Sequence, residues 1–386
     1  MLWANPEMKI LYMGSLTSYV TQNDAAAFKS LGHDVSILSA TPIPSNPIGG
    51  LVNSAKVIQI IGKDYYFHSL SGVLGSTITS ALAGLFRRKS ELIKRAIKEN
   101  DFDMIFANWG SNMIPLVKIV QDMRLHIPII YNFLSYPQNV YKWKVQLENM
   151  YCKKAIENLD VRIYSSENMM AYFRQEFNVR KRGLDIVLQP FFSEKYFCRE
   201  RMPLLSETDG EPHVVFVGPT SLPWDDIRQQ ISRITEGKIH FHMVRPKAPI
   251  KEHAYLHFFP YFPLDRLDDG SLATFMTQFD ACISTFNFEV CSCLDRFHTS
   301  YPSRFLFALN AGVPSVMPRG YLVACEDFVN KYHIGFGYSS VRQLKNKLAK
   351  RDFMASLRRN AINHMPDFAY KKNLSKMNKL MKKVVS

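Results

Sequence analysis

Several common patterns are absent from this chain of 386 residues. Its six cysteines form no Cys-x-x-Cys pair, and Cys291-Ser292-Cys293 has no second ligand pair at zinc spacing. The first residues contain no charged stretch followed by an apolar run, so a secretory signal is not expected. We therefore expect reduced thiols and a cytoplasmic location.

Cofactor and metal motifs are absent as well. No Gly-x-Gly-x-x-Gly follows an apolar run, which argues against a Rossmann oxidoreductase, and we expect no bound cofactor. The acidic pairs Asp225-Asp226 and Asp268-Asp269 are typical of helix starts or turns rather than of a metal-binding pair at a strand end. The sequence therefore predicts no bound metal.

A clear membrane span is also absent. The segment from Ser69 to Phe86 carries no charge and precedes Arg87-Arg88-Lys89, but Ser, Thr and Gly fill about half of it. Both a buried helix and an element lying on a membrane surface fit this composition.

Charge of one sign is concentrated at the end of the chain. The formal net charge is +14, and residues 341–386 carry 13 Lys and Arg against 2 Asp. Such a segment suits an anionic neighbour, such as membrane lipid or a phosphorylated substrate, although a solvated basic tail fits equally. Nucleic acid is an unlikely partner, because the tail lacks interleaved stacking aromatics and any known binding pattern.

The remaining composition is that of a globular protein with two cores. Apolar residues make up 47% and charged residues 21%, and the length exceeds that of one ordinary domain. Short apolar runs alternate with helical patterns, as in parallel sheets wrapped by helices. The predicted strands of the first half are 9–14, 34–40, 103–107, 127–133, 161–165 and 185–190, and those of the second half are 213–218, 238–244, 253–262, 279–285 and 315–317.

The polar stretch 206–212 separates these two series. We predict an α/β fold of two Rossmann-like domains facing a central cleft. The first domain covers residues 1–190, the second covers 191–365, and a basic helix covers 366–386. In this last segment, Phe368, Leu374, Met377, Leu380 and Met381 fall on roughly one helical face.

Ligands in such sheets bind beyond the carboxyl ends of the strands, and one loop there is informative. Pro302 and Ser303 suit a helix start, Arg304 adds a charge in its first turn, and Gly312 suits its end. A helix N-terminus with an arginine can hold a diphosphate. An ordinary helix with an exposed arginine fits the same residues.

This segment, Pro302 to Val316, resembles the donor-site helix of GT-B glycosyltransferases, which commonly read Pro-x-Lys-x-x-Glu-x-x-Ala-x-Gly-x-Pro. Arg304 takes the place of that Lys, and Gly312 and Pro314 match. The opening KILYMGS, the turn at Gly32-His33-Asp34-Val35 and the segment LQPFFSEKYF (residues 188–197) resemble further parts of the family, in the right order.

The resemblance implies transfer of a sugar from a nucleoside diphosphate donor to an acceptor hydroxyl of a glycan or a lipid-linked glycan, as in bacterial surface polysaccharide synthesis. In that case the nucleotide-sugar is a substrate and the donor is a hexosyl or glycuronosyl compound. The implied donor-binding residues are Gly218, Thr220, Arg245, Tyr261, Ser303 and Arg304. The family's C-terminal helix packs back on the first domain, so the lysine-rich face of residues 366–386 would suit a peripheral position on the inner face of the membrane.

Three departures from the family bear on catalysis. Phe307 replaces the Glu that commonly contacts the ribose or sugar, Thr299 replaces its more amino-terminal partner, and the loop 131–135 lacks the usual His. If a base on the acceptor is required, the candidates are Glu167, Asp24 and His68. A non-catalytic relative that binds a nucleotide or a glycan is the main alternative.

Overall fold

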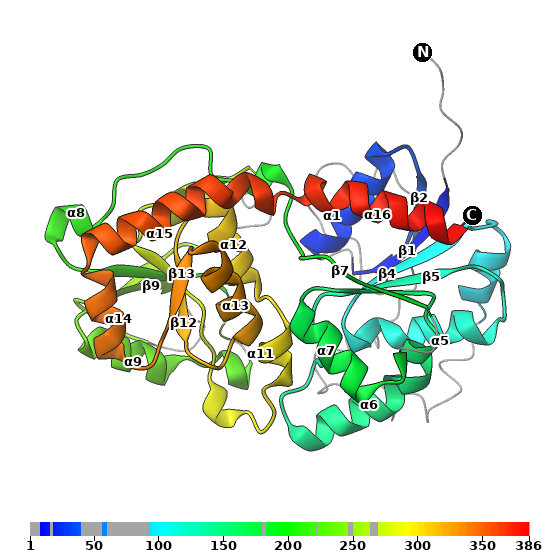
Figure 1. The fold of residues 1–386 in the computed structure, drawn as a ribbon, viewed down its shortest axis with the longest axis horizontal. Helices are drawn as coiled ribbons and strands as arrows, with labels where there is room; N and C mark the ends of the chain where they lie inside the picture. Colours follow the sequence, from blue (N-terminus) through cyan, green and yellow to red (C-terminus); the bar gives the residue numbers. More distant parts are fainter. Residues whose placement is uncertain are drawn as a thin grey trace, which may run out of the picture. The chain divides into compact units, whose positions relative to one another are not determined.

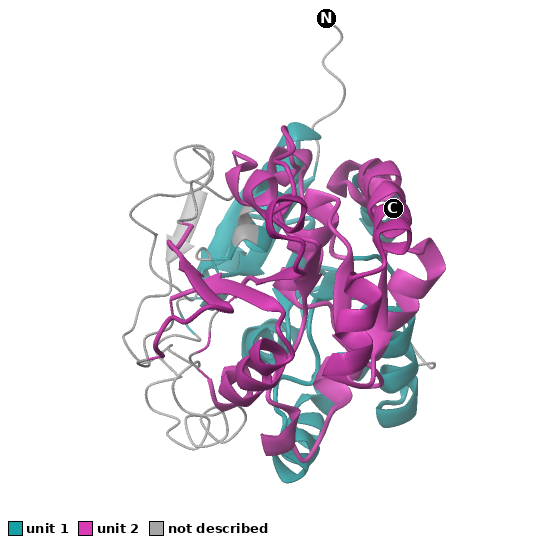
Figure 2. Ribbon diagram, turned by 90° about the vertical axis from the view of Figure 1, so that its left-hand side faces the viewer, with its two compact units in different colours: residues 1–189, 374–386 teal, residues 190–373 magenta. Residues whose placement is uncertain are grey.

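The computed structural model describes residues 8–15, 18–39, 56–59, 91, 93–179, 183–218, 220, 222–245, 250–262 and 269–385. The uncharged segment 69–86 and His68 lie outside these residues. The chain divides into two compact units (Figure 2). One contains residues 1–189 together with 374–386, and the other contains residues 190–373. The sequence suggested boundaries at 190 and 365.

The first unit is built on a seven-stranded parallel sheet in the order β3-β2-β1-β4-β5-β6-β7. Ile10 to Met13 of β1 are fully buried, as expected for a central strand whose two faces are both covered. Its strands are β1 (Lys9–Gly14), β2 (Asp34–Ser39), β3 (Lys56–Gln59), β4 (Met104–Trp109), β5 (Ile129–Phe133), β6 (Val161–Tyr164) and β7 (Leu184–Val187).

Helices connect these strands and cover the sheet (Figure 1). Helix α7 begins where Ser166 accepts a hydrogen bond from the Met169 backbone N–H, which satisfies a free donor of the first turn. The named helices of this unit are α1 (Tyr19–Ser30), α5 (Ile114–Asp122), α6 (Lys142–Glu157), α7 (Glu167–Glu176) and α16 (Tyr370–Val385), of which the last begins in the second unit.

The second unit is built on a six-stranded parallel sheet in the order β10-β9-β8-β11-β12-β13. Its strands are β8 (His213–Phe216), β9 (His240–Val244), β10 (Leu256–Phe259), β11 (Ala281–Ile283), β12 (Ser315–Pro318) and β13 (Gly335–Tyr338). Its helices are α8 (Ser206–Asp209), α9 (Arg228–Glu236), α10 (Ser271–Met276), α11 (Asp295–Thr299), α12 (Ser303–Ala311), α13 (Val323–Tyr332), α14 (Val341–Leu348) and α15 (Arg351–His364).

Both sheets have the Rossmann strand order, in which the first strand lies in the middle and the connections run outward on either side. The predicted fold class of two Rossmann-like domains is therefore confirmed. Strands β3 and β13 were not predicted. In both units the strand order reverses between two central neighbours, β1 and β4 in the first and β8 and β11 in the second.

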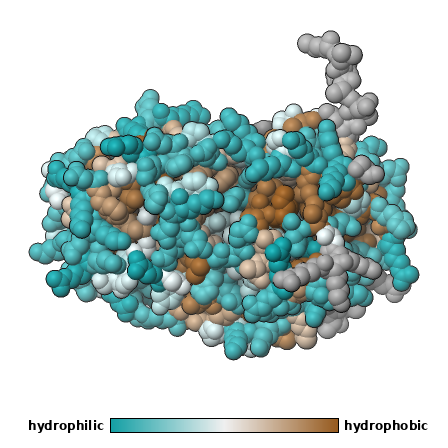
Figure 3. Space-filling model, viewed as in Figure 1, coloured by the Kyte–Doolittle hydropathy of each residue, from teal (hydrophilic) through white to brown (hydrophobic). Residues whose placement is uncertain are grey.

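Helix α16 returns from the end of the second unit to the first. Its side chains Met377, Leu380 and Met381 are buried in a core cluster with Tyr12 and Phe28. Its lysines lie on the exposed face. Figure 3 shows the side of the molecule on which α16 runs, where the surface is mostly hydrophilic with separate hydrophobic patches. Among the described residues, no helix combines the length and apolar character that a membrane crossing needs.

Candidate functional site

Several polar residues of the second unit lie where its strand order reverses. Strand β8 runs into Gly218, and the neighbouring strand β11 runs into Ser284 and Thr285. Helix α12, which follows on the next connection, begins at Ser303 after Pro302 and ends at Gly312 in the left-handed conformation with φ +57°. The predicted helix start and stop are both present.

Arg304 reaches from the first turn of α12 into this region and is buried, with 5% of its surface exposed. Its guanidinium carbon lies 4.2 Å from the ring centre of Phe216 and 4.3 Å from that of Phe286. Nη1 donates a hydrogen bond of 2.6 Å to the Thr285 carbonyl, and Nη2 lies 3.7 Å from Asp225 Oδ1. A cation between two aromatic faces is held by their electron-rich centres.

Burial shifts the pKa values of Arg304 and Asp225. Removal from water lowers the pKa of Arg304 to about 10, and the charges of Asp225 and Cys282 oppose that shift. Burial likewise raises the pKa of Asp225, against the opposing effect of Arg304 and Arg296. Arg304 thus remains a cation at neutral pH. An arginine also has more N–H donors than these contacts use.

Gly218 faces the guanidinium directly. A Cβ placed on it would lie 3.0 Å from Nη2 and 3.3 Å from Nε of Arg304. Its φ of +148° is one that residues with a side chain rarely adopt. The absence of a side chain therefore brings the backbone of the β8 loop against the charged edge of Arg304.

Buried polar atoms without partners lie on the segment from β11 to α12. Ser284 Oγ, Thr285 Oγ1, Asn287 Oδ1 and His298 Nε2 have no hydrogen-bond partner among the described residues. Such atoms are costly to bury, so several on one segment mark a place where a polar ligand could bind. The sequence pointed to the helix start at Pro302 and Ser303 but not to these side chains. For Ser284, Thr285 and Asn287, the position directly after β11 was the available signal.

Two other predicted donor-binding residues, Arg245 and Tyr261, make no described contact with Arg304. Arg245 is exposed, pairs with Glu252 at 3.4 Å and lies over the ring of Phe258. Tyr261 is 70% exposed. Arg296, which the sequence did not suggest, lies over the ring of Trp224, and its charge opposes the rise in the pKa of Asp225.

Ser303 is exposed at the start of α12, and Thr220 is half-buried after Gly218. Phe307, in the place of the family's Glu, is buried with its ring 5.2 Å from that of Phe192. This position is therefore part of the apolar packing of α12. Thr299 is also buried, at the end of α11.

In the first unit, Asp24 lies at the point where strand order reverses. Its side chain is buried, and its Oδ2 accepts hydrogen bonds from the Tyr12 hydroxyl at 2.8 Å and from Asn108 Nδ2 at 3.5 Å. Thr21 Oγ1 in turn donates to Asn108 Oδ1 at 3.3 Å. The structure thus joins the helix α1 to the carboxyl ends of β1 and β4 through one polar cluster.

Glu167 is exposed as the first residue of α7, directly after the N-cap Ser166, and no described contact joins it to Asp24. The nearby loop 134–139 is held by the buried side chain of Glu148, which accepts from the backbone N–H groups of Gln138 at 2.8 Å and Asn139 at 3.2 Å. Carboxylate bonds to two successive amides fix this loop at the end of β5.

Known structures share this architecture over nearly the whole chain. A sucrose-phosphate synthase from Thermosynechococcus elongatus covers 98% of this chain and 99% of its own, with a TM-score of 0.70 and 14% identity. An α,α-trehalose 6-phosphate synthase from Burkholderia multivorans covers 98% of this chain and 99% of its own, with a TM-score of 0.66 and 9% identity. The Anabaena protein HepE, solved in complex with UDP and glucose, covers 97% of this chain and 100% of its own, with a TM-score of 0.64 and 12% identity.

These likenesses show the fold. The chain has the GT-B architecture of two Rossmann-like domains, and the resemblance noted in its sequence is confirmed at that level. No family model matches the chain, and no curated protein matches it by sequence. The chain is thus a divergent member of this fold class.

Proposed function

We propose that this protein is a glycosyltransferase that binds a nucleoside diphosphate sugar at the carboxyl end of β8 and β11. The observation that carries the proposal is the buried Arg304, whose charged edge faces Gly218 at the point where strand order reverses. Open α/β sheets bind their ligands at this point.

The arrangement suits stabilisation of a departing diphosphate. Arg304 supplies a fixed positive charge behind the Gly218 backbone, and the start of α12 supplies a positive dipole end. Because aromatic rings shield Arg304 from water, its field acts through a medium of low polarity. In this role Arg304 positions the loop and stabilises charge, while Ser303, Thr220 and Thr285 offer polar contacts.

The fold neighbours guide the choice of donor. HepE was solved with UDP and glucose, and also with UDP-glucose. A trehalose-phosphate synthase of the same fold is described as UDP-forming. UDP and UDP-hexoses are therefore the first ligands to test, followed by UDP-glycuronic acids and GDP-sugars.

Transfer to the acceptor is proposed to need no metal ion. Asp24 is the buried candidate for a base, but its oxygen already accepts from Tyr12 and Asn108. Glu167 is accessible at a strand end. If the reaction inverts the sugar, one of these carboxylates takes the acceptor proton. His68 remains a candidate from the sequence alone.

For the acceptor we propose a glycan or a lipid-linked glycan of a bacterial surface polysaccharide, with the protein on the cytoplasmic face of the membrane. The exposed lysines of α16 support this location, since anionic lipid attracts each basic residue by about 1 kcal/mol. Replacing Lys379, Lys382 and Lys383 by Glu is expected to reduce co-sedimentation with anionic vesicles. Undiminished sedimentation of the triple variant would contradict the membrane location.

The donor site can be tested with a matched pair of arginines, of which Arg304 is buried and Arg358 is half-buried. Arg304 donates to the Thr285 carbonyl beyond the carboxyl end of β11, and Arg358 donates to the Thr277 and Phe279 carbonyls before its amino end. Burial lowers the pKa of each to about 10. Both Arg304→Leu and Arg358→Leu remove a cation that donates to backbone carbonyls next to β11.

Only Arg304→Leu is expected to abolish the thermal shift with UDP and to slow donor turnover, by about 10²–10³-fold. Arg304→Lys, which keeps the charge, should retain part of both and separates loss of charge from loss of fold. Equal UDP binding by Arg304→Leu and the wild type would refute the proposed site.

One observation favours a second candidate, a non-catalytic nucleotide-binding relative. Phe307 packs on Phe192 where the resembled family commonly has its Glu, so this contact to the donor is missing. UDP binding without sugar transfer or donor hydrolysis, over a broad acceptor screen, would support this alternative.

A further inference from the structure

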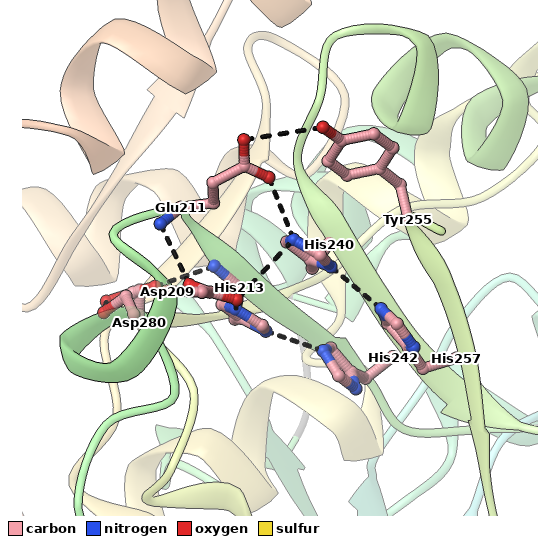
Figure 4. Close-up of polar contacts among 9 residues, drawn as sticks. Asp209, Glu211, His213, His240, His242, Tyr255, His257 and Asp280 are labelled. Atoms are coloured by element: carbon pink, nitrogen blue, oxygen red, sulfur yellow. Dashed lines mark hydrogen bonds and ion pairs between the residues drawn. The ribbon is translucent and has the colours of Figure 1, made fainter. Parts of the chain in front are cut away.

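Four histidines form a stacked cluster on one face of the second sheet. His213 opens β8, His240 and His242 lie on β9, and His257 lies on β10. The strand register pairs His213 with His240 and His242 with His257, so all four side chains point to the same face. Figure 4 shows them together beside two carboxylates, Asp209 and Glu211.

The rings of His213 and His240, here called the front pair, each present one nitrogen to these carboxylates. The rings of His213 and His240 are parallel, with centres 4.3 Å apart. His213 Nε2 lies 2.9 Å from Asp209 Oδ2, and His240 Nε2 lies 3.8 Å from the same oxygen. His240 Nε2 also lies 3.0 Å from Glu211 Oε2. Two imidazole nitrogens thus converge on Asp209, and Glu211 lies against His240.

We propose that Asp209, His213 and His240 bind one zinc ion, and that Glu211, which contacts His240, turns toward the ion as the fourth ligand. Zinc prefers tetrahedral sites of imidazole nitrogen and carboxylate oxygen, with bonds of about 2.0–2.2 Å. Neighbouring ligand atoms of such a site are about 3.4 Å apart, a value between the 2.9 Å and 3.8 Å seen here. The ligand atoms of Asp209, His213 and His240 all lie within 4.8 Å of one another.

The rings of His242 and His257, here called the rear pair, orient the front pair. His213 Nδ1 lies 2.9 Å from His242 Nε2, and His240 Nδ1 lies 2.8 Å from His257 Nε2. When each front Nδ1–H donates to the rear ring, both front Nε2 atoms carry a lone pair for the metal. Histidine ligands are typically held in this way by a hydrogen bond to the other nitrogen.

Charge and access also suit a divalent cation. The carboxylates of Asp209 and Glu211 would balance the two charges of zinc. Their side chains are 40% and 38% exposed, which leaves a path from solvent, while those of the two histidine ligands are 6% and 13% exposed.

The site is structural rather than catalytic. His213 and His240 are the first residues of their strands, whereas the proposed donor site lies beyond the carboxyl end of β8. A bound zinc would join the α8 turn to β8 and β9. It leaves the proposal of metal-independent sugar transfer unaffected.

The first test is a zinc titration of the full chain after chelation, followed by calorimetry, with Co²⁺ as a spectroscopic probe. We expect one equivalent of Zn²⁺ per chain and the visible absorption of tetrahedral Co²⁺. A hundredfold excess of Zn²⁺ over its Kd should raise the unfolding temperature of the second unit by about 5–10 °C. Failure to bind one saturable equivalent would overturn the proposal.

Variants then locate the ion. Asp209→Asn and His240→Gln should each weaken zinc binding by at least about 30-fold, and His257→Gln, which loosens only the rear ring, by about 10-fold. His364→Gln is the matched control, because His364 pairs with Asp367 at 3.1 Å on an exposed surface. Equal zinc binding by Asp209→Asn, His240→Gln and the wild type would place the ion elsewhere and overturn the assignment.

Discussion

The acid sensitivity of the second unit provides a quantitative test of the histidine cluster. His242 lies between the rings of His213 and His257 and against Phe279, with centres 5.1, 4.5 and 4.7 Å away. Burial, with the neighbouring histidines, lowers its pKa to about 2. The folded state therefore resists protonation that the unfolded chain accepts near pH 6.5.

The sign and size of the change in folding stability with pH follow from proton linkage. Because the folded pKa of His242 is below the unfolded value, its stabilising effect is complete above about pH 6.5 and is lost as the pH falls. The loss is about 1.4 kcal/mol per pH unit, or about 2.7 kcal/mol at pH 4.5. The pKa values of His213 and His257 are also lowered, so they add to the slope in the same direction.

We expect His242→Phe to remove this one contribution. Urea unfolding of the second unit in a chelator, at about pH 7.5 and pH 4.5, should show a pH-dependent loss smaller by about 2.7 kcal/mol than in the wild type. Phe336→Leu is the control, since it loosens the core of the second unit on β13, away from the histidine strands, and removes no titrating group. It should lower stability equally at both pH values. An unchanged pH difference in His242→Phe would refute the burial argument.

Three further predictions concern single contacts. Gly218→Ala, which places a Cβ 3.0 Å from Arg304 Nη2 at φ +148°, should cost about 1–3 kcal/mol in thermal unfolding of the second unit. Met381→Ala should destabilise the first unit by about 2–5 kcal/mol in urea, whereas Val385→Ala, at a site 38% exposed, should cost less than about 0.5 kcal/mol. Glu148→Gln should cost about 1–3 kcal/mol and speed hydrogen exchange at the amides of residues 138 and 139, because a side-chain amide accepts their N–H bonds less well; unchanged exchange would contradict this role.

The fold was largely predictable because buried parallel strands are apolar on both faces. The run Lys9–Gly14 matches β1 at both ends, and most other strands differ by a few residues at their boundaries. Strand β13 was missed because two of its four residues are glycines, which favour turns in a sequence. The structure requires one of them, since a Cβ on Gly335 would lie 1.9 Å from the Ser315 carbonyl oxygen.

The site was less predictable because its contacts join distant segments. The sequence placed Arg304 at a helix start, but its burial depends on Phe216 of β8 and on Asp225 and Phe286 from other segments. The histidine cluster has the same origin. Its members stand on three strands and share no metal-binding spacing, so only the sheet register brings them together.

The return of α16 to the first unit has a consequence for biosynthesis. Residues 190–373 are an insertion between the two segments that build the first unit. During synthesis the strands of that unit leave the ribosome first, but Met377, Leu380 and Met381 complete its core only after residues 190–373 have been made. A nascent first unit therefore exposes an apolar surface over Tyr12 and Phe28 until the whole second unit has been made. The emergence of α16, rather than that of residues 1–189, is the point at which the first unit can become stable.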